Sequence, residues 1–229
     1  MTIQTKLILM SAPMVLATLR EIEAPGTGKT QTRRIIKPQP IVPADLDGSV
    51  NEAWQAGFIG VKCPYGKPGD LLYVRENWQA LSFGDYVPTK NHVSDVRYAA
   101  TDPLADLDGD ARGYPWRPSI HMPRWASRIT LEITDIRVER LQSISEADVR
   151  AEGLRADRPD PRPTMPAGVG CMSPITWGDG KYYTAISAYR GLWTSINGPE
   201  SWDKNPWLWA VTFTPHLINV DEFIKERGS

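Results

Sequence analysis

The alternation of apolar and polar residues along the chain predicts several strands. The clearest pattern lies at 128–138, where Ile129, Leu131 and Ile133 alternate with polar residues, as in a strand with one buried face. An apolar run at 7–10 and a β-branched and aromatic segment at 71–76 predict two more strands. In the segment 207–214 both alternating sets of residues are largely apolar, which predicts a strand buried on both faces.

Three segments carry helix signals instead. Ser11 is a candidate N-cap, with Pro13 near the first helical position and a periodic apolar run behind it. The sequence Ser-Glu-Ala-Asp at 145–148 resembles a capping box and opens a helix to about 152, and Gly153 suits the left-handed position after it. Apolar residues at helical spacing over 185–196 predict a third, amphipathic helix.

The order of these elements predicts the fold class. Strands separated by short helices and long loops, without a repeated strand–helix–strand unit, indicate an α+β protein with a mixed β-barrel. Stretches rich in proline and glycine predict loop insertions at about 37–68, 100–123 and 155–181. Because no linker separates two cores, we expect one domain over 1–229.

Composition narrows the classes of function. The chain has 229 residues, 41% hydrophobic and 23% charged, as in an ordinary globular protein. It has no apolar stretch of the roughly 20 residues that span a bilayer, and its first apolar run has no basic segment ahead of it. We therefore expect a cytoplasmic protein with no membrane partner. The net charge of −1 argues against a binder of long duplex nucleic acid, but it permits a local basic pocket for one nucleotide or a short single strand.

The cysteines and histidines of the sequence do not indicate a metal site or a disulfide. The two cysteines lie far apart in the sequence, and none of the three histidines has metal-ligand spacing to another. We therefore expect no metal and no cofactor.

The densest candidate for chemistry is the segment 29–34. Lys29, Arg33 and Arg34 place three cations within six residues, which is enough for an anion pocket, although a solvated basic loop has the same composition. The Gly-Lys-Thr at 28–30 invites a P-loop interpretation. That interpretation fails because Glu23 stands where the motif needs a glycine, and because a helix rather than a strand precedes it.

The spacing of Lys29 and Thr32 suggests a reactive pair. The two residues are three positions apart, so on a helical turn they would share one face. A lysine whose pKa is lowered by burial or by neighbouring cations can act as a base and activate a hydroxyl. Arg33 and Arg34 are such neighbours.

Blocks of sequence along most of the chain resemble the ASCH family, most closely its phage and prophage members. The blocks are Ser11–Met14, Lys29–Arg34, Pro68–Asp70 with Val74–Glu76, Trp125 with Ser127–Leu131, Glu152–Gly153 and Asn205–Trp207. The resemblance implies a PUA-like barrel with flanking short helices. Small bacterial members of the family are amidohydrolases that remove the acetyl group from N4-acetylcytidine, so it also implies that activity.

The resemblance also assigns roles to residues. The family's catalytic lysine, threonine and glutamate fall on Lys29, Thr32 and Glu152, and its arginine falls on Arg34, with Arg33 intervening. Either Thr32 attacks the amide carbonyl with Lys29 as base, or water attacks and Thr32 donates to the oxyanion. In both mechanisms, Glu152 either orients or protonates the departing amine, or it positions the water molecule. The longer turn before Lys29 and the greater chain length depart from the small hydrolases and leave the substrate open.

Three further residues belong to the expected substrate pocket. Arg75 and Glu76 lie on a strand that enters the pocket region of the family, where Glu76 would read a base edge or form an ion pair. Trp78 follows, and would stack on a base or pack in the core. We therefore expect an amidohydrolase acting on N4-acylated cytidine or a related modified nucleoside. An RNA or modified-nucleotide binding module without turnover, or a ribonuclease, are the alternatives, and the oligomeric state stays open.

Overall fold

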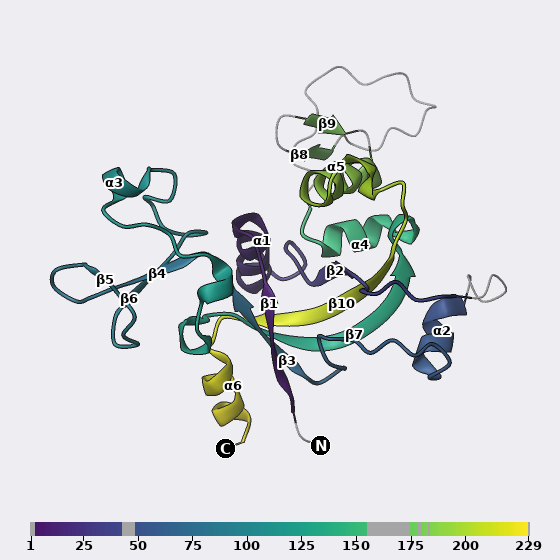
Figure 1. The fold of residues 1–229 in the computed structure, drawn as a ribbon, viewed down its shortest axis with the longest axis horizontal. Helices are drawn as coiled ribbons and strands as arrows, with labels where there is room; N and C mark the ends of the chain where they lie inside the picture. The colour runs from purple at the N-terminus through teal and green to yellow at the C-terminus, as the bar shows by residue number, and fades with distance from the viewer. Residues whose placement is uncertain (1–2, 43–48, 155–174, 178–179, 183, 229) are drawn as a thin grey trace. The chain divides into compact units, whose positions relative to one another are not determined.

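The computed structural model describes residues 3–42, 49–154, 175–177, 180–182 and 184–228 (Figure 1). Most of the expected insertion at 155–181 lies outside the described residues. The chain forms two compact units. The first falls within 1–25, 64–135 and 213–229, and the second within 26–63 and 136–212.

The elements of the structure are mostly short. The strands are β1 Thr5–Leu9, β2 Gln31–Ile35, β3 Leu71–Arg75, β4 Trp78–Leu81, β5 Pro88–Thr89, β6 Asp95–Tyr98, β7 Thr130–Arg140, β8 Ile175–Trp177, β9 Gly180–Tyr182 and β10 Trp207–His216. The α-helices are α1 Ala12–Glu23, α2 Val50–Gln55, α3 Gly109–Arg112, α4 Glu146–Ala151, α5 Ala185–Asn197 and α6 Val220–Arg227. Short 3-10 turns lie at Ser119–His121, Arg124–Ala126, Leu141–Ser143 and Pro199–Ser201.

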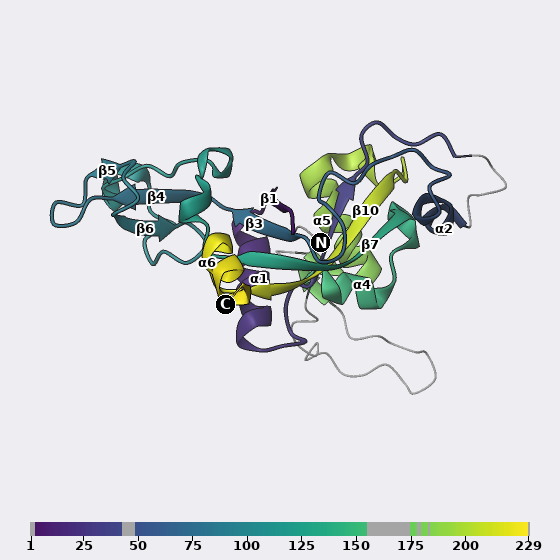
Figure 2. The same ribbon diagram turned by 90° about the horizontal axis from the view of Figure 1, so that it is seen from below.

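In the first unit, β3 lies between two partners. It runs parallel to β1, with Thr5 opposite Leu71, and antiparallel to β7, with Tyr73 opposite Thr130. A second, smaller sheet has β4 between β5 and β6 (Figure 2). The C-terminal helix α6 packs Val220 and Phe223 against Leu71 and Tyr73 of β3, which forms one of the buried clusters of this unit.

In the second unit, β2 pairs antiparallel with β10, from Gln31 opposite Thr212 to Ile35 opposite Leu208. Helices α4 and α5 lie side by side (Figure 1). Each begins with a capping box, at Ser145 and at Thr184 respectively, which satisfies backbone N–H groups that the first turn leaves free. Their apolar faces share a buried cluster that includes Val149, Leu154, Ala188, Tyr189 and Trp193.

Most elements expected from the sequence are present. The structure is α+β, and it has the expected strands β1, β3, β7 and β10 and helices α1, α4 and α5. Residues 207–211 at the start of β10 are all buried, as the two-sided apolar pattern predicts. Gly153 follows α4 with φ of 90°, a left-handed conformation that glycine adopts without a steric penalty. Among the described residues, no helix has both the length and the apolar character required to cross a membrane.

Two local expectations are wrong. The segment 31–35 is a strand, not a helical turn, because its backbone pairs with β10 along its whole length. The loops expected over 37–68 and 100–123 contain the short helices α2 and α3, respectively. Helix α2 forms because Val50 and Ala53 are buried, and Trp54 packs edge-on against Trp209 of β10 at 5.0 Å between ring centroids. Apolar anchors of this kind outweigh the loop-forming composition around them.

Candidate functional site

Backbone pairing in the second unit brings Lys29 and Glu152 together. They form an isolated antiparallel bridge just before β2, and the Thr30 N–H donates to the Ala151 carbonyl at 2.8 Å. Residues directly opposite in an antiparallel pair project to the same side. The bridge therefore brings the Lys29 side chain to the Glu152 side chain at the end of α4.

The two side chains make a short, buried contact. Lys29 Nζ donates to Glu152 Oε2 at 2.6 Å and to the Glu152 carbonyl oxygen at 3.1 Å. The side chains are 1% and 6% exposed. A lysine that binds a carbonyl at a helix C-terminus also satisfies an acceptor that the helix leaves free. The contact thus fixes the end of α4 against the start of β2.

Burial makes Lys29 chemically unusual. Removal from water disfavours the ammonium and lowers the pKa of Lys29 below its ordinary value. The carboxylate of Glu152 opposes this shift, while the charges of Arg34 and Arg33 add to it. The result is an amine that loses its proton more readily than an exposed lysine does, which is the property a general base needs.

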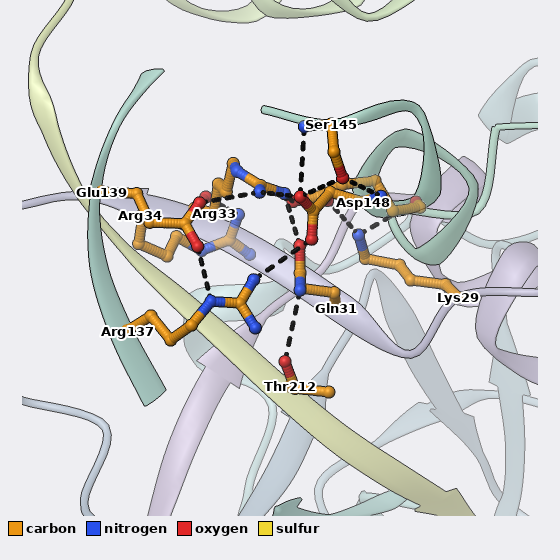
Figure 3. A network of polar contacts seen from close by, with 10 residues as sticks. Lys29, Gln31, Arg33, Arg34, Arg137, Glu139, Ser145, Asp148 and Thr212 are labelled. Atoms are coloured by element: carbon orange, nitrogen blue, oxygen red, sulfur yellow. Dashed lines mark hydrogen bonds and ion pairs between the residues drawn. The ribbon is translucent and has the colours of Figure 1, made fainter. Parts of the chain in front are cut away.

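Arg33 is surrounded by carboxylates (Figure 3). Its Nη2 lies 3.0 Å from Glu139 Oε2 and 3.3 Å from Asp148 Oδ2, and its Nη1 lies 3.4 Å from Glu152 Oε1. Nη1 also donates to Gln31 Oε1. Burial alone would lower the pKa of Arg33, but the carboxylates raise it. Arg33 therefore stays charged and is engaged by protein groups.

Asp148 joins this network to the start of α4. Its Oδ2 accepts the Ser145 backbone N–H at 3.1 Å and the Ser145 hydroxyl at 2.6 Å, while its Oδ1 accepts from Arg137 Nη2 at 3.1 Å. Burial would raise the pKa of Asp148. The Ser145 hydrogen bonds, the charge of Arg33 and a hydrogen bond from Gln31 outweigh that effect and lower the pKa to about 2. One carboxylate thus caps the helix and ties it to β2.

Several members of this network carry no signal in the sequence. Glu139 is one polar position in the alternation of β7, and its partner Arg33 is 106 residues away. Tyr189, which lies in the periodic segment 185–196, is buried, and its pKa lies well above the ordinary value because of burial and then the charge of Glu152. The pattern identifies Tyr189 as inward-facing but not as a neighbour of these charges.

Thr32 does not face the same way as Lys29. The Gln31 amide donates to the hydroxyl of Thr212 directly opposite, and Arg33 bonds to Gln31, so both side chains lie on one face of β2. Successive strand residues alternate, so Thr32 projects to the other face. The shared face expected from helical spacing is therefore wrong. Thr32 is fully buried, and among the described residues its Oγ1 has no hydrogen-bond partner.

Arg34 is the half-buried cation of the segment. Its Nη1 donates to the Arg33 carbonyl oxygen at 3.4 Å, and its charge helps to lower the pKa of Lys29. Lys29, Arg33 and Glu152 therefore lie in contact or near contact in the second unit, and the charge of Arg34 also acts on Lys29. By the alternation of strand residues, Thr32 and Arg34 project to the face of β2 opposite Gln31 and Arg33.

The other expected pocket residues lie in the first unit and have partners there. Glu76 is 2% exposed and forms a bidentate ion pair with Arg128, at 2.9 and 3.0 Å. Burial raises the pKa of Glu76, and Arg128 opposes that shift. Arg75 donates to the Ile120 carbonyl at 3.0 Å. Trp78 is 1% exposed and packs edge-on against Trp125, so it is a core residue.

No cluster of three or more histidine, cysteine or carboxylate side chains is placed to bind a metal ion within the described parts of the chain. Comparisons with models of protein families, with curated proteins and with solved structures yield no match to this chain.

Proposed function

We propose that the protein is a cytoplasmic amidohydrolase acting on N4-acylated cytidine or a related modified nucleoside, with Lys29 and Glu152 at the reacting centre. The observation that carries the proposal is the buried 2.6 Å contact between Lys29 Nζ and Glu152 Oε2. The resemblance of the segments 29–34 and 152–153 to the ASCH family supports the substrate class. We also propose a PUA-like barrel, which the resemblance to the ASCH family supports.

The proposed step is hydrolysis of the exocyclic amide. Water attacks the acyl carbon while neutral Lys29 accepts the proton of the water. A C–O bond forms, the bond between the acyl carbon and N4 breaks, and the proton passes from Lys29 to the departing amine. The products are a carboxylic acid and cytidine. Glu152 holds Nζ in position and stabilises the ammonium that forms during the step.

Water rather than threonine is the nucleophile that the geometry favours. A threonine nucleophile must give its proton to Lys29, but Thr32 projects to the face of β2 opposite Gln31 and Arg33. The Thr32 hydroxyl is buried and lacks a hydrogen-bond partner among the described residues. We keep it as a proposed hydrogen-bond donor to the oxyanion, a role that a variant can test.

The alternatives of RNA binding and RNA cleavage require cations that can reach a phosphate. Lys29 and Arg33 have side chains 1% and 0% exposed and are engaged by carboxylates. A cation already bound to buried carboxylates contributes little to the binding of an external phosphate. This observation argues against phosphate binding by these two side chains.

The test is incubation of the purified protein with N4-acetylcytidine, with release of cytidine followed by chromatography. Lys29→Met and Glu152→Gln are expected to lower turnover at least about a hundredfold, as the loss of a general base does. The matched control is Lys62→Met, because Lys62 is an exposed lysine of the same unit. Folded protein without turnover, or equal turnover in all variants, would contradict the proposal.

A further inference from the structure

Arg33 is an enclosed cation of the second unit. Its side chain is 0% exposed. It lies within 3.4 Å of three carboxylates that come from two elements, Glu139 on β7 and Asp148 and Glu152 on and after α4. An arginine in such a position orients the carboxylates that it binds, since the planar guanidinium has donors in a fixed arrangement.

The contacts of Arg33 argue against a role as a substrate-binding cation of the expected anion pocket. Four acceptor groups, those of Gln31 and the three carboxylates, already surround Nη1 and Nη2. The Nε atom is buried, without a hydrogen-bond partner among the described residues. A substrate atom would have to displace one of these carboxylates, which would then be buried without a counterion at high cost.

The contact with Glu152 has a consequence for Lys29. Arg33 Nη1 approaches Oε1 of that carboxylate, while Lys29 Nζ binds Oε2. The two cations thus divide the two oxygens between them. Loss of the contact to Oε1 leaves the carboxylate free to rotate about its last torsion, which is broad in glutamate, and Oε2 is then no longer fixed opposite Nζ.

We propose that Arg33 is a positioning residue of the amidohydrolase site, which acts by holding the Glu152 carboxylate toward Lys29 and by favouring the neutral amine through its charge. This inference rests on the proposed function. The charged or titratable groups that act on Lys29 directly are Glu152, Arg33 and Arg34. Those that act on Arg33 or its carboxylates from the surrounding elements are Glu139, Asp148, Arg137 and Tyr189.

Two variants separate the charge of Arg33 from its shape. Arg33→Gln removes the charge, so the protonation equilibrium of Lys29 should move to higher pH. Arg33→Lys keeps the charge but loses the planar arrangement of guanidinium donors. The protonation equilibrium of Lys29 should therefore be unchanged, and turnover should fall about tenfold. The control is Arg150→Gln, because Arg150 lies on α4 but its side chain is 68% exposed.

The measurement that does not depend on activity is a pH titration of protein labelled with ¹³C at lysine Cε, followed by NMR. The Lys29 signal is assigned by its loss in Lys29→Met. The pH profile of turnover on N4-acetylcytidine is measured in parallel. In Arg33→Gln the acidic limb of this profile should move to higher pH, in the same direction as the titration of the Lys29 signal.

Each outcome supports or overturns the inference. If the Lys29 titration is unchanged in Arg33→Gln, the charge of Arg33 does not act on the protonation of Lys29. If turnover is unchanged in Arg33→Lys, Arg33 is not a positioning residue. The proposed function stands in both cases. If Arg33→Gln does not fold, the turnover of Arg33→Lys tests the positioning role. If the wild-type protein has no turnover, the proposed function fails and the positioning role for catalysis fails with it, even where the Lys29 titration moves as expected.

Discussion

Lys29 and Glu152 are 123 residues apart in the sequence, yet Lys29 Nζ lies 2.6 Å from Glu152 Oε2. The pair is buried, and it connects the residues before β2 to the last turn of α4. A buried ion pair contributes little net stability compared with apolar residues of similar size, but loss of one partner leaves an unbalanced charge. The pair should therefore show strong energetic coupling.

That coupling is the first prediction. Lys29→Met and Glu152→Leu should each lower the free energy of unfolding by up to about 3–5 kcal/mol, because Lys29→Met leaves Glu152 with only the longer contact to Arg33 and Glu152→Leu leaves the buried Lys29 amine without its carboxylate. The double variant should cost much less than the sum of the two. Urea denaturation followed by circular dichroism measures all four proteins of the cycle. Additive losses would show that the two side chains do not interact in solution.

A second prediction concerns acid stability. The pKa of Asp148 is about 2 in the folded protein, against about 3.9 in an unfolded chain. Between these values the unfolded state binds more protons, so this carboxylate stabilises the fold above about pH 4 and the contribution is lost as the pH falls toward 2. The free energy of unfolding should therefore fall over this range.

The matched variant for acid stability is Asp148→Asn. It should be less stable at neutral pH, because the ion pairs with Arg33 and Arg137 are lost. Its stability should depend less on pH between 4 and 2 than that of the wild type. Denaturant titrations at pH 2, 3, 4 and 6 make the comparison, and parallel curves for the two proteins would contradict the role of Asp148.

The sequence predicts best where the signals are local. The capping box of Ser145 and Asp148 and the left-handed Gly153 lie within a few residues of each other, and both are present in the structure. The apolar alternation of β7 is likewise visible at once, because burial of one face requires it. These signals define α4 and the strand that precedes it.

The strand β2 could not be predicted in the same way. Gln31, Thr32 and Arg33 contain no apolar residue, so the segment resembles a solvated basic loop. It is a buried strand because carboxylates more than a hundred residues away neutralise Arg33. Polar groups enter a core only when such partners exist, and the sequence does not show where the partners lie. Glu152 as a candidate came from the family resemblance alone.

A third prediction concerns the first unit. The buried Glu76 and the partly exposed Arg128 form a bidentate ion pair, and the Arg128 guanidinium lies 3.9 Å from the ring centroid of Tyr98. We expect Glu76→Ala to cost about 1–3 kcal/mol of stability, because it leaves the partly exposed Arg128 without its counterion. Arg128→Lys should cost less, because a single charge remains while the bidentate geometry and the stacking are lost.

Turnover on N4-acetylcytidine distinguishes this structural role from substrate binding. If Glu76 only stabilises the fold, the Michaelis constant of the folded Glu76→Gln variant should match that of the wild type. A Michaelis constant raised tenfold or more, with stability unchanged, would restore Glu76 as a reader of the base.

The last prediction decides the nucleophile. Valine has nearly the shape of threonine without its hydroxyl, and Thr32 Oγ1 is buried without a hydrogen-bond partner in the described structure. Thr32→Val should therefore be as stable as the wild type or more stable by up to about 1 kcal/mol. If water attacks, this variant should keep turnover within about tenfold of the wild type, whereas Lys29→Met loses at least about a hundredfold. Loss of turnover in a stable Thr32→Val, with activity kept in Thr32→Ser, would instead identify the threonine hydroxyl as the attacking group. It would also require that Thr32 and Lys29 reach the same substrate atom from opposite faces of β2.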